Sequence, residues 1–153
     1  MDFKNNMQMP PALVSATYKK RGAVVHTDKG TVIVAEHGKF LLVVNTYGGV
    51  VHTCVINTDK NKFAPPNSQV AIDDKDMPWI GKDEDSGKDK VLTHVSYVDC
   101  SKIFDVDEED FGKAIENGTF QPKGFLDETS MCYVLDAGQN CKTLRPFERK
   151  YFE

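Results

Sequence analysis

The sequence predicts a mainly β domain of the α+β class: a small antiparallel β-barrel or strongly curved sheet with one or two short C-terminal helices. Three observations predict it. Two hairpin patterns rich in β-branched residues occupy residues 21–58, a further strand pattern returns at residues 91–106, and helical spacing begins only after that point. The chain has 153 residues, which suits one domain, because two would each have little core.

The first hairpin is expected in residues 21–36, RGAVVHTDKGTVIVAE. Its β-branched residues favour strands, and Asp28-Lys29-Gly30 is expected to form the tight turn, with glycine supplying a positive φ. Residues 1–20 are expected to be an extended lead-in, because Pro10-Pro11 disfavours a helix there.

The second hairpin is expected in residues 40–58. Phe40 to Val44 is a continuous apolar run, as in a strand buried on both faces, and Gly48-Gly49 supplies the turn. Residues 50–58 then alternate between two faces. Four strands packed in sequence order form a meander that must curl to cover its core.

Residues 59–90 differ in composition, since they hold three of the seven prolines and many charges. We expect a long charged loop with one short strand, Gln69 to Ile72. Trp79-Ile80 is expected to anchor the loop, and residues 82–90 to form its exposed tip.

The strand pattern that returns at residue 91 predicts two strands, residues 91–100 and 102–106. A helix is expected to follow from Asp107 as its N-cap, with acidic residues in its first turn, and to stop at Gly118. A second helix is expected to start near Asp127 and to stop at Gly138. Their apolar stripes predict core packing: Phe111, Ala114 and Ile115 in the first, and Met131, Val134 and Leu135 in the second. The barrel domain is expected to span residues 21–140, and residues 141–153 to form a tail with no clear period.

Composition indicates a cytoplasmic, globular protein. No apolar stretch approaches the roughly 20 residues that span a bilayer, and the N-terminus has no apolar core of signal-peptide type. None of the four cysteines forms a C-x-x-C pair, and Cys54 and Cys100 lie in apolar runs that predict burial. Residues 1–62 carry a net charge of +4 and residues 63–153 a net charge of −8. The basic half could offer a local surface to nucleic acid, or the split could merely keep the protein soluble.

Several kinds of chemistry lack their signatures. His26, His37, His52 and His94 are scattered without metal-ligand spacing, neither glycine-rich phosphate motif occurs, and no nucleophile elbow is present. We therefore expect no metal and no cofactor.

Metal-free cleavage of RNA remains open to this sequence. It needs a base for the 2′-hydroxyl, an acid for the leaving oxygen, and positive charge for the phosphorane. Residues 36–62 contain side chains suited to these roles: His37, Lys39, His52, Asn57, Thr58, Lys60 and Lys62. Lys39 begins one strand of the second hairpin and Thr58 ends the other, so both are expected at one rim of the sheet. The alternative is a solvated strand edge whose lysines prevent aggregation.

These segments resemble the MazF/PemK-type plasmid-maintenance toxins. GKFLLVVNT and VINT stand where that family has an apolar strand, R-P-V-V-V-V-S, and a strand ending in V-x-P-I-T. HVSYVDCSKIFDVDEEDF is similar to the family's strand before its C-terminal helices, and FQPKGFLDETSMCYVLDAG to the start of its terminal helix. The resemblance covers about residues 20–140. The chain has Lys39 where the family usually has arginine. The family's proline before Ile-Thr is also missing, and Asn57 lies between Ile56 and Thr58.

The resemblance implies a small SH3-like barrel, usually dimeric, that cuts single-stranded RNA without metal as a toxin-like growth regulator. It implies an antitoxin-like protein as inhibitor. The roles of the family's basic residue and its threonine or serine would fall on Lys39 and Thr58. His37 or His52 would transfer protons, and Asn57, Lys60 and Lys62 would bind substrate. The alternative is a non-catalytic binding module on the same barrel, which holds a protein partner or nucleic acid through residues 59–90.

Overall fold

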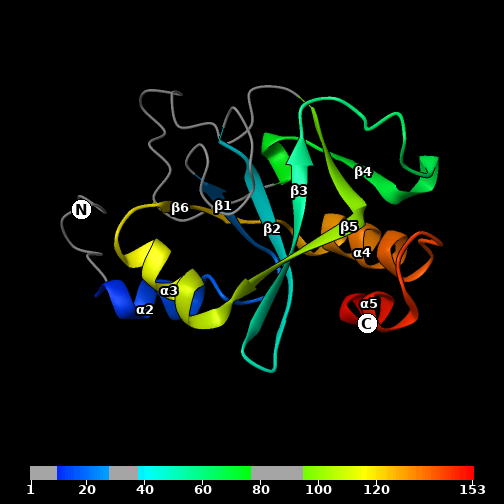
Figure 1. Ribbon diagram of the computed structural model, residues 1–153. Coiled ribbons are helices and arrows are strands. Elements are labelled where there is room, and N and C mark those ends of the chain that lie inside the picture. The colour runs from blue at the N-terminus through cyan, green and yellow to red at the C-terminus, as the bar shows by residue number, and fades with distance from the viewer. Residues whose placement is uncertain (1–9, 28–37, 77–94) are drawn as a thin grey trace.

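The computed structural model describes residues 10–27, 38–76 and 95–153 (Figure 1). The described helices and strands follow one another as α2 (Pro11–Thr17), β1 (Ala23–Thr27), β2 (Phe40–Tyr47), β3 (Val50–Asn57), the 3-10 turn η1 (Pro66–Ser68), β4 (Gln69–Ile72), η2 (Asp74–Asp76), β5 (Ser96–Asp107), α3 (Glu108–Glu116), β6 (Phe120–Phe125), α4 (Glu128–Gln139), α5 (Pro146–Arg149) and η3 (Lys150–Phe152). The six strands form one antiparallel sheet in the order β4-β5-β3-β2-β1-β6. The molecule is therefore a mixed α+β protein, and no ladder between described residues joins the edge strands β4 and β6.

The predicted β2–β3 hairpin is confirmed, and it lies at the centre of the sheet. Its two-residue turn, Gly48-Gly49, has φ values of 62° and 79°, which L side chains rarely adopt. Leu41 to Val44 are fully buried, and Val51 to Ile56 of β3 are buried. Both faces of the hairpin are therefore buried, and each needs its own cover.

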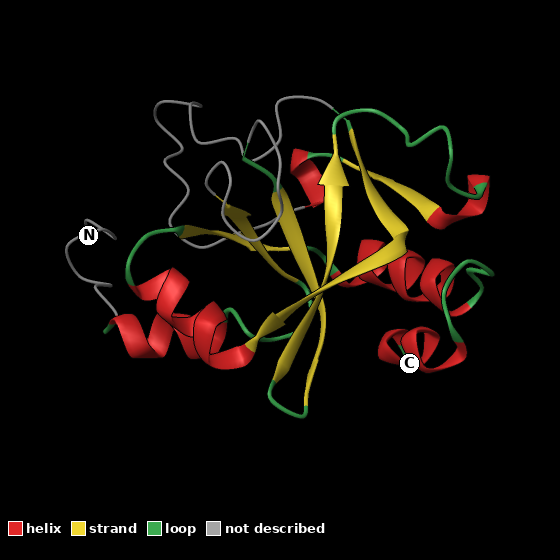
Figure 2. Ribbon diagram, in the orientation of Figure 1, coloured by secondary structure: helices red, strands yellow, loops and turns green. Residues whose placement is uncertain are grey.

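Two apolar clusters lie on the two faces of this sheet. Leu42, Val44 and Cys54 of the hairpin belong to one cluster, together with Val134 of α4 and Phe152 of η3. The alternating hairpin residues belong to a second cluster, which includes Phe111 and Ile115 of α3 and packs against Val14 of α2. Figure 2 shows the helices in two groups, α2 with α3 and α4 with α5, on either side of the strands.

The prediction of two strands in residues 91–106 is wrong for the described part of that segment: Ser96 to Asp107 form one strand, β5. Thr53 pairs with Phe104 and Val55 with Asp99, so four residues of β5 face Cys54 alone. Extra residues in one strand bend it, and β5 bends sharply in Figure 1. The expected break at Ser101 is this bulge, where Asp99 Oδ1 accepts hydrogen bonds from the Ser101 amide and hydroxyl.

The two predicted helices after β5 are confirmed. Asp107 caps α3 by accepting a hydrogen bond from the Asp110 amide, and Asp127 caps α4 by accepting one from the Ser130 amide. Gly118, with φ of 85°, follows the end of α3. Gly138, by contrast, does not stop α4, which continues to Gln139. A Cβ at Gly138 would collide with the Phe152 ring, so this glycine is a packing contact.

Residues 141–153 are not a tail outside the domain. Cys141, Leu144 and Phe152 belong to the same cluster as α4. Arg21 holds this segment to β2: its Nε donates to Val44 O at 2.7 Å and its Nη2 to Tyr151 O at 3.1 Å and Glu153 O at 2.7 Å. The segment shows no clear sequence period because it packs through short turns, α5 and η3.

The extended lead-in predicted for residues 1–20 is wrong where the structure describes it. Pro11 to Thr17 form α2, with Pro11 at the first helical position. Proline is tolerated there because its missing N–H would have no partner in the first turn. Strand β6 was not predicted, because it contains Pro122 and Gly124, residues that strands rarely contain.

Other predictions have mixed outcomes. The strand Gln69–Ile72 is confirmed as β4. The expected turn at Asp28-Lys29-Gly30, the strand after it, the anchor Trp79-Ile80 and the tip at residues 82–90 lie outside the described residues. The predicted pairing of β1 with that strand is wrong, and so is the meander of four strands in sequence order, because β1 lies between β2 and β6. Among the helices of the described ranges, none is both long and apolar enough to cross a membrane.

The predicted burial of Cys54 and Cys100 is confirmed, and neither forms a disulfide. A hydrogen bond with the Cys100 thiol, together with burial, raises the pKa of Cys54 well above its ordinary value. Since the thiolate is the reactive form, Cys54 is a packing residue and not a nucleophile.

Two helical glycines test the packing of the C-terminal segment. Gly138→Ala should lower the free energy of unfolding by about 1–3 kcal/mol, because its Cβ overlaps the buried Phe152 ring. Gly112→Ala in α3 is the matched control, since its Cβ would meet mainly the end of the flexible Lys19 side chain, at 3.2 Å from Nζ. That change should be neutral or stabilise by up to about 1 kcal/mol. Urea unfolding measures both, and equal effects would contradict the packing of Phe152 against α4.

Candidate functional site

A row of side chains crosses one end of the sheet on the face covered elsewhere by α2 and α3. Thr27 pairs with Phe120, Asn57 with Tyr97, and Tyr97 with Ala71. Lys39 immediately precedes the pair Phe40–Ile56, and so continues the ladder opposite Asn57. Because alternate residues share a face, Thr27, Lys39, Asn57 and Tyr97 form one line, which we call the strand-end row.

Exposure rises along the strand-end row. Phe120 and Thr27 are buried, at 1% and 2% exposure. Phe120 belongs to the apolar cluster that includes Phe111 and Ile115 of α3. Lys39, Asn57 and Tyr97 are half-buried, and Ala71 is exposed. Lys39 and Asn57 therefore stand where the covered apolar face ends, with their backbones fixed in the sheet.

Two contacts with β1 fix the backbone of Lys39. The Thr27 amide donates to Lys39 O at 2.7 Å, and the Lys39 amide donates to Thr27 Oγ1 at 3.2 Å. Gly38, the residue before it, allows this close approach, because a Cβ there would collide with Thr27 O and the His26 ring. Lys39 is thus held by contacts with β1, in addition to its place at the start of the β2–β3 hairpin.

The structure brings most of the predicted site residues to this end. Lys39 and Asn57 share the strand-end row, and Thr58 follows Asn57 as an exposed residue just past the end of β3. Lys60 and Lys62 are exposed on the loop that continues from Thr58, and the Lys60 ammonium lies 5.5 Å from the centroid of the Tyr97 ring. The predicted proximity of Lys39 and Thr58 at one rim therefore agrees with the described pairing of β2 with β3.

His52 is not part of this end, and the prediction that it transfers protons there is wrong. It lies five residues before Asn57 along β3, about 17 Å at the usual rise per residue. Its ring is 4% exposed, stacks on Tyr151 at 3.6 Å, and holds Asp105 Oδ1 at 2.6 Å from Nδ1. His52 thus anchors the C-terminal segment to the sheet.

Two other histidines concern this end. His37 lies outside the described residues. His26 was not among the predicted site residues, yet it pairs with Phe40, contacts its ring at a centroid distance of 4.7 Å, and lies under Gly38. Strand alternation places it on the face opposite Lys39. Because His26 is next to the end of an expected strand, the sequence could have placed it at this end of the sheet.

A hydrogen-bonded loop borders the strand-end row on the β4 side. Asn61 is the centre of this loop. Its backbone amide donates to Gln69 Oε1 at 2.6 Å, and its backbone carbonyl accepts from Gln69 Nε2 at 2.9 Å. Asn61 Nδ2 also donates to Asp99 Oδ2 at 3.2 Å, and the Asp99 side chain is nearly buried. The bulge of β5 and the loop after β3 are therefore joined through one buried carboxylate.

Both signs of charge occur among the described residues at this end. Lys39, Lys60 and Lys62 form no ion pair with a described carboxylate. Asp59 is exposed, and the oxygens of Asp99 accept hydrogen bonds from Asn61 and Ser101. Asp73 and Asp76 follow the end of β4, where it pairs with the start of β5. Within the described ranges, no group of three or more His, Cys, Asp and Glu side chains is placed to hold a metal ion.

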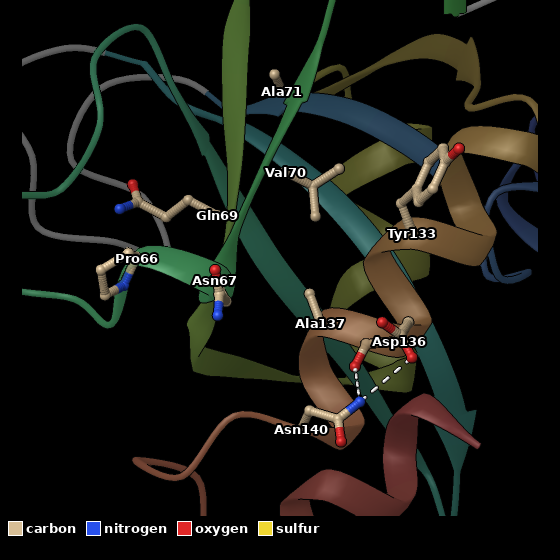
Figure 3. Close-up of a pocket in the computed structure, with 9 residues that line it drawn as sticks. All are labelled: Pro66, Asn67, Gln69, Val70, Ala71, Tyr133, Asp136, Ala137 and Asn140. Atoms are coloured by element: carbon tan, nitrogen blue, oxygen red, sulfur yellow. Dashed lines mark hydrogen bonds between the residues drawn. The ribbon is translucent and has the colours of Figure 1, made fainter.

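A separate groove lies between the edge strand β4 and helix α4 (Figure 3). Its volume is about 670 Å³, and Pro66, Gln69 to Ala71, Tyr133 and Asn140 are among its lining residues. Asn140 Nδ2 donates to Asp136 O at 2.8 Å and lies 3.2 Å from its carboxylate, as Figure 3 shows. Part of the wall comes from residues 59–90, the segment that the alternative function invoked.

Comparisons with known proteins find no matching family model and no matching curated protein.

Proposed function

We propose that the protein is a metal-independent endoribonuclease that cuts single-stranded RNA at the strand-end row. The observation that carries the proposal is the placement of Lys39 and Asn57 side by side where the covered face ends, with Thr58 next in the chain. The proposal includes an SH3-like barrel of the MazF/PemK type. The bent strand β5 and the meander order of β1, β2 and β3 support that part of it.

The chemistry uses the RNA's own nucleophile. The 2′-oxygen loses its proton and forms a bond to the adjacent phosphorus, and the bond from phosphorus to the 5′-oxygen breaks. The products are a 2′,3′-cyclic phosphate and a 5′-hydroxyl, which receives a proton. Lys39 stabilises the phosphorane that forms in between, while Thr58 and Asn57 donate hydrogen bonds to its oxygens. His37 is the residue proposed to transfer the protons of the 2′-hydroxyl and the 5′-oxygen.

The lysine at position 39 fits this role with one difference from the family that the sequence resembles. An ammonium is a point charge, whereas a guanidinium can donate two parallel hydrogen bonds to phosphate oxygens. The backbone of Lys39 is held by two hydrogen bonds with Thr27, so the side chain starts from a fixed position at the end of the sheet.

The biological setting of the proposal comes from the resemblance alone. It comprises a toxin-like regulator of growth, a homodimer in the cytoplasm, and an antitoxin-like protein as inhibitor. Growth arrest on expression, relieved by a neighbouring small protein, would support this setting.

Cleavage of a labelled single-stranded RNA of mixed sequence in excess EDTA tests the chemistry. Wild-type protein should yield fragments with 2′,3′-cyclic phosphate ends. Lys39→Ala should lower kcat about 100- to 1,000-fold, the usual effect of removing one group that stabilises a developing anion. Lys39→Arg should retain cleavage, because the charge remains.

Lys150→Ala is the control, since Lys150 is exposed at the start of η3, next to Tyr151, which stacks on His52 away from the strand-end row. It should cleave at the wild-type rate. Intact RNA with wild-type protein across varied sequences would contradict the enzyme proposal, and so would full activity in Lys39→Ala.

A second candidate is a binding module that holds an extended peptide in the groove between β4 and α4. The observation that favours it is the position of β4 at the edge of the sheet that the described strands form, since an edge strand can pair with another strand. Tyr133 lines this groove and is 64% exposed, and tyrosine is enriched at interface hot spots.

Affinity capture tests this second candidate. A partner held by wild-type protein should be lost from Tyr133→Ala and kept by Tyr47→Ala, which removes a similarly exposed tyrosine (76%) at the β2–β3 turn. A truncation of this kind at a hot spot costs about 2 kcal/mol or more of binding free energy. Equal capture by both variants would remove the groove from the account.

A further inference from the structure

Phe63 is the most exposed large apolar side chain of the described residues, at 98%. It lies in the loop between β3 and η1, and it contributes nothing to either apolar cluster. A single exposed apolar residue is common on protein surfaces and needs no function. What distinguishes Phe63 is the way its loop is held and what surrounds it.

The loop presents Phe63 from a fixed backbone. The Phe63 amide donates to Asn61 Oδ1 at 3.0 Å, and the Ala64 amide donates to Asn61 O at 3.3 Å. Asn61 is itself tied to Gln69 of β4 and to the nearly buried Asp99 of β5. An exposed ring on such a loop has already lost most of the backbone entropy that binding would otherwise cost.

The neighbours of Phe63 are cationic and aromatic. Lys62 precedes it and is exposed, and Lys60 lies over the Tyr97 ring of the strand-end row. Phe63 is three residues after Lys60, so their Cα atoms are at most about 11 Å apart. A nucleic-acid strand whose phosphates lie along Lys39 and Lys60 therefore has bases within reach of the Phe63 ring.

The chemistry favours a nucleobase over a protein side chain as the occupant. Lysine is depleted in protein–protein interfaces, whereas an exposed aromatic ring beside lysines is the usual arrangement for binding single strands. Every base offers a flat π-face, so stacking adds affinity without selecting one base.

We propose that Phe63 is a stacking platform for a base of the single-stranded RNA, adjacent to the strand-end row. This inference rests on the proposed function and adds a residue that sets affinity. The lysines bind the phosphates, and Phe63 binds one base. Since Phe63 does not touch the scissile phosphate, its loss should raise KM and leave kcat nearly unchanged.

Fluorescence anisotropy with a labelled 2′-O-methyl oligoribonucleotide, which lacks the nucleophile and stays intact, measures binding directly. Phe63→Ala should weaken it about 5- to 150-fold, the range seen when a stacking aromatic is removed. Phe63→Leu should weaken binding nearly as much, because leucine keeps the apolar surface and loses the π-face, whereas Phe63→Trp should keep the affinity. Tyr47→Ala, which removes an exposed ring at the opposite end of the hairpin, should bind as wild type does.

The salt dependence separates stacking from charge. Lys62→Ala should reduce the slope of log K against log salt by up to about 1, while Phe63→Ala should leave that slope unchanged. Wild-type affinity in Phe63→Ala, in protein that still cleaves RNA through Lys39, would overturn the stacking inference and leave the proposed function intact. A wild-type protein that neither binds nor cleaves RNA would overturn both.

Discussion

The burial of both faces of the β2–β3 hairpin constrains every other element of the fold. Leu41 to Val44 send side chains to both sides and are fully buried, so neither face can remain open to water. α2 and α3 cover one face, while α4 and the C-terminal segment cover the other. Arg21, bonded to β2 and to η3, joins the start of the domain to its end. The chain after residue 140 is therefore part of the core and cannot be treated as an appendage.

The same constraint determines where polar chemistry can occur. The centre of the sheet is covered, so polar side chains reach water where the strands extend past the helices. Lys39 and Asn57 do so at one end of β2 and β3, beside the buried Thr27. The Lys39 backbone is hydrogen-bonded to Thr27 and Asn57 pairs with Tyr97, which suits groups that must hold a phosphate in place. The loop anchored by Asn61 extends this fixed surface toward β4.

Local patterns in the sequence predicted the parts of the fold that depend on neighbours in the chain. The β2–β3 hairpin, β4, both caps and the shared rim of Lys39 and Thr58 all follow from alternation, turn residues or capping residues. Contacts between segments that are far apart in the sequence could not be predicted in this way. Tyr151 stacks on His52, which is 99 residues before it, and Phe152 packs against Gly138, which is 14 residues before it. Proline and glycine are the reason that two elements were not predicted. Pro11 begins helix α2, and Pro122 and Gly124 lie within strand β6.

Backbone amide shifts measured by NMR, as ¹⁵N-labelled protein is titrated with a 2′-O-methyl oligoribonucleotide, test the central claim most directly. The account predicts that the largest shifts fall on Lys39, Asn57 and Tyr97 and on the loop from Thr58 to Phe63, while the Gly48-Gly49 turn stays unchanged. Shifts confined to the groove of Tyr133 and Asn140, or no shift at saturating oligonucleotide, would contradict the assignment of the strand-end row as the RNA site.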